Sequence, residues 1–226
     1  MPLDVSRIQA LCFDVDGTLS DTDDLFVRHV TRWLQPASFL FTGKNLHPFV
    51  RRLVMAIESP GNYLLGLPDR LDLDDELSAL GDWIYRVGLG RSSHPFLLVP
   101  GVRETLSQLQ RCYPMAIISA RGKHSTRAFL EQFELSHFFQ CVVTAQTCAH
   151  TKPYPDPILY AASHMGVPPQ ACLMIGDTYV DILAGKAAGA QTVGVLCGFG
   201  EEGELRRAGA DAILPTTSLI NSVLMV

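Results

Sequence analysis

Residues 10–18 read ALCFDVDGT, and the fold that the sequence predicts is built around this stretch. An apolar run typical of a buried strand ends in two carboxylates, Asp14 and Asp16, followed by Gly17. Side chains two positions apart on an extended backbone point to the same side, and the glycine permits a tight turn. Two carboxylates ~4 Å apart repel each other by about 4 kcal/mol at an effective dielectric near 20. We therefore expect a cation close to this strand end.

Two simpler interpretations exist for the same stretch. An Asp-Gly dipeptide taken alone most often marks a turn. A calcium-binding loop of the EF-hand type needs Gly and Glu at its sixth and twelfth positions, and counting from Asp14 these are Leu19 and Leu25. The turn therefore stays open on this stretch alone, whereas the calcium loop is excluded.

The rest of the chain indicates how this strand is used. From residue 97 onward, four more near-continuous apolar runs alternate with amphipathic stretches. The apolar runs are 114–120, 140–145, 171–177 and 190–196, and the stretches with helical spacing are 102–110, 127–133, 157–165 and 181–189. Such runs are typical of parallel strands buried on both faces, and their alternation with helices predicts a parallel sheet between helical layers. The predicted fold class is α/β, with a Rossmann-like three-layer parallel sheet core.

Residues 20–96 have a different pattern. No run there resembles a strand, and helical patterns cover 21–34, 46–57 and 74–87. The last of these opens with a group of acidic residues suited to a helix N-terminus. We predict an all-helical cap domain at 20–96, inserted into an α/β core domain made of 1–19 and 97–226.

Composition excludes several classes of protein. The 226 residues carry 18 basic and 23 acidic side chains, a formal charge of −5, and contain no basic run, so nucleic acid is not an expected partner. No stretch of ~18 apolar residues could span a membrane, and the N-terminus lacks the apolar core of a signal peptide. The six cysteines have no zinc-site spacing and are expected to be buried, reduced thiols. These features indicate a soluble cytoplasmic protein.

Polar side chains stand at the ends of the predicted strands. Asp14, Ser119 and Asp177 end three of the apolar runs, and Lys152 follows the run 140–145 after a short loop. Ligands bind outside the carboxyl ends of the strands in open parallel sheets, so these side chains should meet at one edge. Taken singly, each has a structural interpretation, as a helix cap or a solvated residue. Together, acids with a hydroxyl and a lysine suit a cation and an oxyanion, which favours phosphoryl transfer with Mg²⁺.

The ordered motifs DVDGT (14–18), Ser119, Lys152 followed by Pro153, and GDTYVD (176–181) resemble those of the haloacid dehalogenase-like (HAD) hydrolase superfamily. The resemblance covers nearly the whole chain and includes a helical cap after the first motif, as in the phosphoglycolate-phosphatase-like branch. It implies a Mg²⁺-dependent phosphomonoester hydrolase that acts on a small phosphorylated metabolite through an aspartyl-phosphate intermediate. That metabolite is the expected partner, and the chain is expected to be a monomer or a homodimer.

The resemblance assigns roles to the first motif. Asp14 is implied to be the nucleophile and a Mg²⁺ ligand. Asp16 is implied to be the general acid and base, with its backbone carbonyl on the metal. Gly17 and Thr18 are implied to support this loop and to lie at the phosphate.

It also assigns roles to the later motifs. Ser119 is implied to hold a phosphate oxygen, with Ala120 beside it in the phosphate site. Lys152 is implied to neutralise both the nucleophile and the phosphate. Asp177 is implied to bind Mg²⁺, and Asp181 to lie in or just behind the first shell of the metal.

Asp16 narrows the reaction further. Haloacid dehalogenases and phosphonate-cleaving relatives lack an acid two residues after the nucleophile, and the latter need a cap lysine, for which only Lys44 is available. Phosphosugar mutases keep both acids, so a mutase is an open alternative. A non-catalytic binding or regulatory module is the other open alternative, although such a module has no need of Asp16.

The second motif departs from the family pattern, since it reads Ser119-Ala120-Arg121. Many phosphoglycolate-phosphatase-like members have Asn in place of Ala120, and alanine cannot make its hydrogen bond, so the resemblance supports the phosphatase class rather than phosphoglycolate as the substrate. Arg121 is expected to face the substrate or the cap, or to form a surface salt bridge. Four cap arginines are candidates for a second anionic group of the substrate, or for a solvated helix face: Arg28, Arg32, Arg51 and Arg52.

Overall fold

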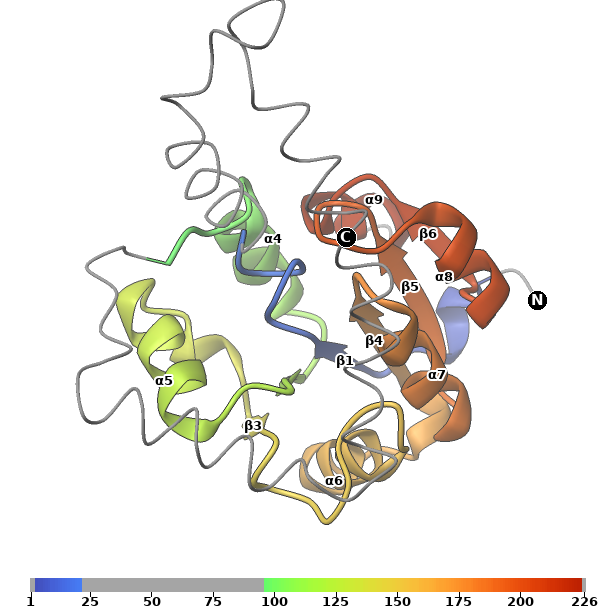
Figure 1. Ribbon diagram of the computed structural model, residues 1–226, viewed down its shortest axis with the longest axis horizontal. Helices are drawn as coiled ribbons and strands as arrows, with labels where there is room; N and C mark the ends of the chain where they lie inside the picture. Colours follow the sequence, from blue (N-terminus) through green and yellow to red (C-terminus); the bar gives the residue numbers. More distant parts are fainter. Residues whose placement is uncertain (1–2, 22–95, 225–226) are drawn as a thin grey trace, which may run out of the picture.

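The computed structural model describes residues 3–21 and 96–224, and their centre is a sheet of six parallel strands (Figure 1). The strands are β1 (Ala10–Phe13), β2 (Met115–Ile118), β3 (Cys141–Val143), β4 (Cys172–Gly176), β5 (Gln191–Val195) and β6 (Ala212–Leu214). Their order across the sheet is β3-β2-β1-β4-β5-β6. The α/β fold class with a Rossmann-like parallel sheet is confirmed.

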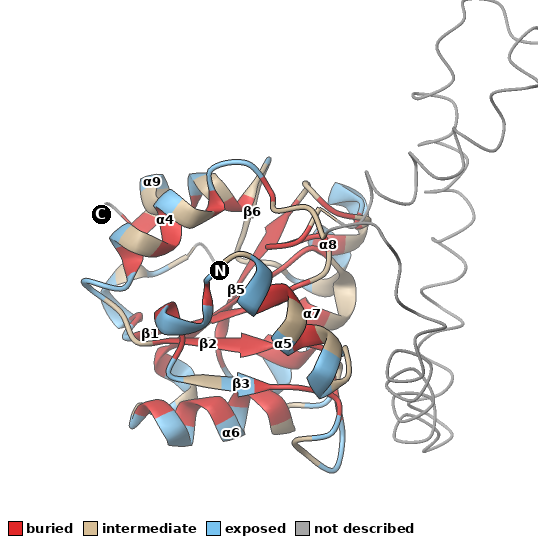
Figure 2. Cartoon of the chain, turned by 90° about the vertical axis from the view of Figure 1, so that its left-hand side faces the viewer, coloured by how far each residue is buried: buried red, intermediate tan, exposed pale blue. Residues whose placement is uncertain are grey.

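Helices cover both faces of the sheet. The helices are α4 (Val102–Leu109), α5 (Lys123–Gln132), α6 (Asp156–Met165), α7 (Tyr179–Ala187), α8 (Glu202–Ala208) and α9 (Ile220–Leu224). One core joins α4, α5 and α9 to one set of alternate strand residues, including Leu11 and Phe13 of β1. A second core joins α6 and α7 to the other set, including Ala10 and Cys12. Because both faces are covered, the residues of β1, β2, β4 and β5 are buried throughout, which explains their continuous apolar runs, whereas the edge strands β3 and β6 are partly exposed (Figure 2).

Short 3-10 turns complete the described elements. They are Val5–Arg7, Ser136–Phe138, Pro169–Ala171 and Thr217–Leu219. Three elements lie outside the predicted set: β6, α8 and α9. α5 begins four residues earlier than predicted, and α7 begins two residues earlier.

The two described segments meet where the chain leaves the core. Leu19 O accepts a hydrogen bond from Val99 N at 2.9 Å, and Asp21 N donates to Leu97 O at 2.9 Å. Ser20 and Leu98 form an antiparallel bridge between these contacts. Residues 21 and 96, on either side of the intervening chain, therefore lie close together beside the loop that follows β1. The predicted cap helices and cap arginines lie outside the described residues, and the predicted domain boundaries stay a prediction.

The cysteines follow the expectation only in part. Cys12 and Cys172 are buried, Cys141, Cys148 and Cys197 are partly buried, and Cys112 is exposed; all six are free thiols. Cys112 is exposed because it follows the end of α4, in the turn before β2. Within residues 3–21 and 96–224, no helix has the length and apolar character needed to cross a bilayer.

Candidate active site

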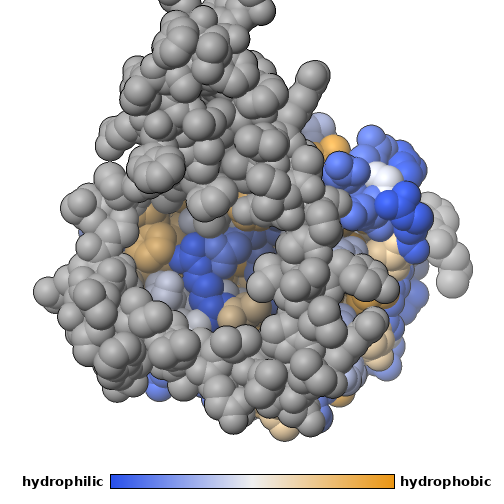
Figure 3. Space-filling view, in the orientation of Figure 1, coloured by the Kyte–Doolittle hydropathy of each residue, from blue (hydrophilic) through white to orange (hydrophobic). Residues whose placement is uncertain are grey.

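The polar strand ends converge where the strand order reverses. β1 is followed in sequence by β2 and β3 on one side, and β4 lies on its other side. Asp14 directly follows β1, and its backbone N–H donates to Ile175 O of β4 at 2.9 Å. Asp177 directly follows β4, and Ser119 directly follows β2. This reversal of strand order is the usual ligand site of open α/β sheets, and Figure 3 shows hydrophilic residues gathered near the centre of this face.

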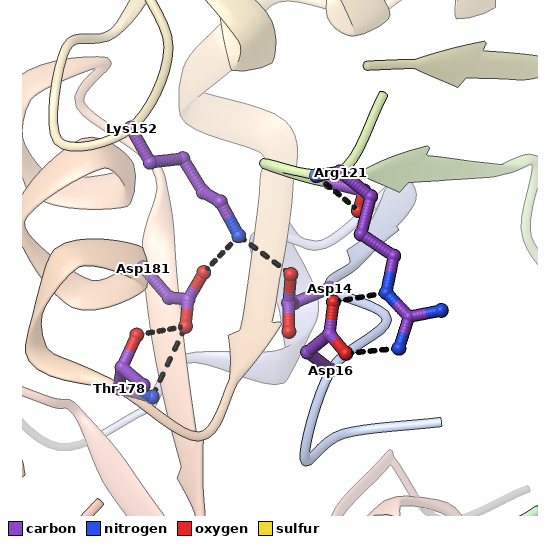
Figure 4. Close-up of polar contacts among 7 residues, drawn as sticks. Asp14, Asp16, Arg121, Lys152, Thr178 and Asp181 are labelled. Atoms are coloured by element: carbon purple, nitrogen blue, oxygen red, sulfur yellow. Dashed lines mark hydrogen bonds and ion pairs between the residues drawn. The ribbon is translucent and has the colours of Figure 1, made fainter. Parts of the chain in front are cut away.

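Lys152 joins two of the carboxylates (Figure 4). Its Nζ donates to Asp14 Oδ1 at 2.6 Å and to Asp181 Oδ1 at 2.5 Å. The three side chains are only 3%, 6% and 1% exposed for Lys152, Asp14 and Asp181. Burial of this kind strengthens the attraction and makes removal of either partner costly. The fold thus brings together Asp14 and Lys152, which are 138 residues apart in the chain.

Burial also changes how the pair binds protons. Burial raises the pKa of Asp14 to about 7, with the charge of Lys152 acting against the rise and Asp181 and Asp16 adding to it. Burial acts to lower the pKa of Lys152, but the charges of Asp14 and Asp181 outweigh it and the pKa is raised. The lysine therefore keeps its proton at neutral pH. Asp14, in contrast, is divided between its two forms near pH 7 when no cation accompanies it.

Asp181 has a second task at the start of α7. Its Oδ2 accepts hydrogen bonds from Thr178 N at 3.0 Å and from Thr178 Oγ1 at 2.7 Å. Thr178 is the N-cap of α7, and the pair forms a capping box. With Oδ1 on Lys152 and Oδ2 on Thr178, Asp181 is held in one orientation. This motif therefore does form a helix cap, with Thr178 as the N-cap, and the Asp181 carboxylate in it is buried.

Asp177 is enclosed by backbone. Its Oδ2 accepts a hydrogen bond from Phe199 N at 2.9 Å, in the loop after β5. A Cβ on Gly198 would lie 2.1 Å from Asp177 Oδ2, and a Cβ on Gly17 would lie 2.2 Å from the same atom. Gly17 also has a φ of +70°, which favours glycine. The Phe199 amide therefore holds the Asp177 carboxylate, and positions 17 and 198 leave no room for a side chain beside it.

Three carboxylates together suit a divalent cation. One oxygen from each of Asp14, Asp177 and Asp181 lies within 4.8 Å of the others, and all three residues are buried. The single ammonium of Lys152 balances one of the three negative charges when all are ionised. Hard divalent cations prefer such oxygen ligands. The residues therefore fit a divalent metal, with Asp14 and Asp177 better placed than Asp181, whose oxygens are already engaged.

Asp16 lies at the edge of this cluster. Its two carboxylate oxygens both accept from Arg121: Nε donates to Oδ2 at 2.5 Å, and Nη2 donates to Oδ1 (Figure 4). The Asp16 side chain is 35% exposed and that of Arg121 only 16%. Of the alternatives left open for Arg121, the structure favours a salt bridge, but one beside the site and mostly buried.

The remaining predicted residues lie around the same strand ends. Ser119 is buried, and its Oγ accepts from Arg121 N at 3.1 Å. Ala120 is exposed. Gly17 makes the turn after Asp16, and its N–H donates to Ser20 O at 2.9 Å. Thr18 is buried, and its Oγ1 has no hydrogen-bond partner among the described residues.

Phe199 and Gly198 belong to none of the predicted motifs, and for Arg121 the sequence left the partner open. Phe199 and Gly198 orient Asp177, and Arg121 holds Asp16. The sequence GFG at 198–200, directly after a predicted strand, was an available signal, because glycines at a strand end often permit close approach of backbone. No comparable signal marked the partner of Arg121.

Comparisons with known proteins agree with this geometry. A family model described as haloacid dehalogenase-like hydrolase matches residues 8–189. The chain is 32% identical over 194 residues to pyrophosphatase PpaX of Bacillus velezensis, covering 84% of this chain and 83% of that protein. It is 30% identical over 197 residues to phosphoglycolate phosphatase of Pseudomonas putida, covering 83% of this chain and 69% of that protein.

Solved structures share the fold. A hydrolase from Pseudomonas syringae superposes with a TM-score of 0.63 at 23% identity, covering 96% of this chain and 99% of that one. A HAD-superfamily hydrolase from Ehrlichia chaffeensis superposes with a TM-score of 0.58 at 20% identity, covering 100% and 98%. With the family model spanning most of the sequence, the chain belongs to the haloacid dehalogenase-like hydrolases.

Proposed function

We propose that this chain is a Mg²⁺-dependent phosphomonoesterase that hydrolyses a small phosphorylated metabolite through a phosphoryl group carried on Asp14. The observation that carries the proposal is the buried Lys152 ammonium, 2.6 Å from Asp14, in a cluster with two further carboxylates. An attacking carboxylate and a phosphate are both negatively charged, so positive charge must offset their repulsion. A lysine and a cation site beside one aspartate supply that positive charge. The curated relatives reported above, named as a pyrophosphatase and a phosphatase, support the same class of reaction.

The proposed reaction has two steps. In the first, an Asp14 oxygen bonds to phosphorus while the ester P–O bond breaks, and Asp16 gives its proton to the leaving oxygen. In the second, Asp16 takes a proton from the water that attacks the phosphoryl group on Asp14. Phosphate leaves, and both carboxyl groups return to their starting state. Lys152 and the Ser119 hydroxyl are proposed to hold the phosphoryl oxygens in both steps.

The proposed metal site follows from the same cluster. Asp14 and Asp177 would hold Mg²⁺ through carboxylate oxygens, with the backbone carbonyl of Asp16 as a third ligand. Asp181 would stand behind this shell and orient Lys152, because its oxygens bond to Lys152 and to the start of α7. When bound, the cation supplies stabilisation of the negative charge on the transferring phosphoryl group.

A colorimetric assay tests the proposal. Phosphate release from p-nitrophenyl phosphate is compared for the wild type and Asp14→Asn, with Mg²⁺ and with excess chelator. We expect release by the wild type only, abolished by chelator and restored by Mg²⁺. Equal release by the two proteins would reject Asp14 as the nucleophile, and full activity in chelator would contradict the metal assignment.

The same preparation separates the alternatives. A phosphosugar mutase would isomerise a sugar phosphate with little release of phosphate, and a non-catalytic module would release none from any member of a phosphometabolite panel. For Asp16→Asn we expect turnover of alkyl phosphates to fall by roughly 10²–10⁴-fold, which is the usual contribution of general acid–base catalysis. Undiminished turnover would remove the role assigned to Asp16.

A further inference from the structure

Arg121 makes contacts that the proposed reaction does not use. Its guanidinium donates to both oxygens of Asp16, from Nε at 2.5 Å and from Nη2. Such bidentate pairs between arginine and carboxylate fix direction as well as distance. The Asp16 side chain is 35% exposed, against 6% for Asp14, so packing alone does not hold it. The guanidinium is a contact that holds both of its oxygens.

Arg121 is itself anchored from several sides. Its backbone N–H donates to Ser119 Oγ at 3.1 Å, and its carbonyl accepts from Ala145 N at 3.2 Å. The guanidinium carbon lies 5.1 Å from the centre of the Phe96 ring, within the range of a cation–π contact. The side chain is therefore pinned between an aromatic ring and a carboxylate.

Phe96 is held in turn by α5. Its backbone N–H donates to Gln132 Oε1 at 3.2 Å, and its carbonyl accepts from Gln132 Nε2 at 2.9 Å. Its ring meets that of Phe129 edge to face, with centroids 5.8 Å apart. A chain of contacts therefore runs from α5 through Phe96 and Arg121 to the carboxylate of Asp16.

We propose that Arg121 is a positioning residue that fixes the Asp16 carboxyl group for proton transfer to the leaving oxygen. While one Asp16 oxygen carries the proton, the guanidinium holds the other oxygen, and once the proton has left, Nε and Nη2 hold both oxygens of the carboxylate, as in the structure. The inference rests on the proposed function, because it needs Asp16 to be the general acid. A displacement of about 1 Å in a reacting group can reduce a rate by about 10²-fold. Lysine cannot replace this arginine, because an ammonium is a point charge and lacks the planar fork that grips two oxygens.

A rival role for Arg121 is direct contact with the substrate. Its third nitrogen, Nη1, is buried and has no hydrogen-bond partner among the described residues. Removal of an arginine that binds substrate raises KM for every substrate carrying the bound group, whatever the leaving group. Removal of an arginine that positions the acid instead lowers kcat/KM most for substrates with a basic leaving oxygen, because these depend most on proton transfer from the acid.

The experiment measures kcat/KM of the full chain for a series of substituted aryl phosphates, from p-nitrophenyl phosphate to phenyl phosphate. This ratio reports the steps up to phosphoryl transfer to Asp14, where the acid acts. For the wild type we expect kcat/KM to fall only slightly as the leaving group becomes more basic, because the acid protonates the leaving oxygen. For Asp16→Asn we expect kcat/KM to fall steeply along the same series. For both Arg121→Met and Arg121→Lys, we expect a loss of about 10–100-fold with phenyl phosphate and under about threefold with p-nitrophenyl phosphate.

Three further proteins sharpen the result. Arg206→Met is the matched control, because Arg206 forms a similar pair with Glu202 on the exposed face of α8, and it should behave as the wild type. The double variants of Asp16→Asn with Arg121→Met and with Arg121→Lys should be no slower than Asp16→Asn alone, since Arg121 acts through Asp16. If Arg121→Met fails to fold, Arg121→Lys and its double variant carry the same expectation.

The outcomes separate this inference from the function on which it rests. An unchanged leaving-group dependence in the Arg121 variants, a change in KM alone, or additive losses in a double variant would each overturn the positioning role. If Asp16→Asn itself kept the wild-type dependence, the role of Asp16 in the proposed function would fall, and the positioning role with it. If phosphate release is lost in Asp14→Asn but unchanged in the Arg121 variants, the proposed function stands and only the positioning role of Arg121 is rejected.

Discussion

Replacement of Lys152 by methionine perturbs the buried cluster most directly. Lys152 Nζ lies 2.6 Å from Asp14 Oδ1 and 2.5 Å from Asp181 Oδ1. By Coulomb's law, each contact is worth about 6 kcal/mol at an effective dielectric near 20, before desolvation is subtracted. Breaking a buried pair by removal of one partner costs about 3–5 kcal/mol in practice, because the remaining charge stays buried. We therefore expect Lys152→Met to lower the free energy of unfolding by about 3–5 kcal/mol at pH 8 without metal.

Two conditions should reduce this loss. At pH 5.5 the loss should be smaller, because the pKa of Asp14 is already raised by burial and the variant lacks the lysine that opposes the rise. A protonated Asp14 then leaves less negative charge in the cluster. Saturating Mg²⁺ at pH 8 should also stabilise the variant more than the wild type, since a more negative site binds the cation more tightly.

Urea unfolding with and without Mg²⁺ at both pH values measures these effects. Arg206→Met is the control: Arg206 pairs with Glu202, and both side chains are exposed, at 69% and 52%. Its removal should cost at most about 1 kcal/mol, with no response to Mg²⁺ beyond that of the wild type. A loss below about 1 kcal/mol for Lys152→Met, or a loss equal at the two pH values, would refute the account of the cluster.

Two further predictions concern the same carboxylate cluster. Gly198→Ala should weaken Mn²⁺ binding, followed by electron paramagnetic resonance, by about 10–100-fold, because its Cβ would displace the Asp177 carboxylate. Gly203→Ala, whose Cβ meets only the end of Arg207 at 3.4 Å, should bind Mn²⁺ as the wild type does, and equal affinities for the two variants would contradict the assignment. The raised pKa of Asp14 means that the metal-free native state keeps a proton that the unfolded chain releases near pH 4, so rising pH should destabilise the wild type between about pH 4 and pH 7. Asp14→Asn should lack this decline in thermal unfolding, and parallel pH profiles for the two proteins would show that Asp14 is not the titrating group.

Much of the fold could be predicted because buried parallel strands have a simple signature. Four runs beyond β1 contain strands in the structure, since helices on both faces of the sheet favour apolar side chains on both sides of a strand. β6 escaped prediction because its three residues are only partly buried and show no period. α8 had usable signals, with acids in its first turn, arginines in its last turn and Gly209 at its C-cap.

The site could be predicted as far as strand ends determine it. Asp14 and Asp177 meet because their strands are neighbours, and the backbone alone brings them together. The pairing of Arg121 with Asp16 depends on side-chain conformations of two separate loops, which no local pattern encodes. The double use of Asp181, on Lys152 and on the helix start, likewise needed the three-dimensional arrangement.

Chemical trapping of the phosphorylated enzyme shows which carboxylate carries the phosphoryl group. Wild-type protein turning over p-nitrophenyl phosphate is quenched in acid, treated with borohydride, digested, and examined by mass spectrometry. Borohydride reduces an acyl phosphate to an alcohol, so the account predicts homoserine at position 14 and at no other aspartate. Turnover with an unmodified Asp14, or with the modification at another carboxylate, would contradict it.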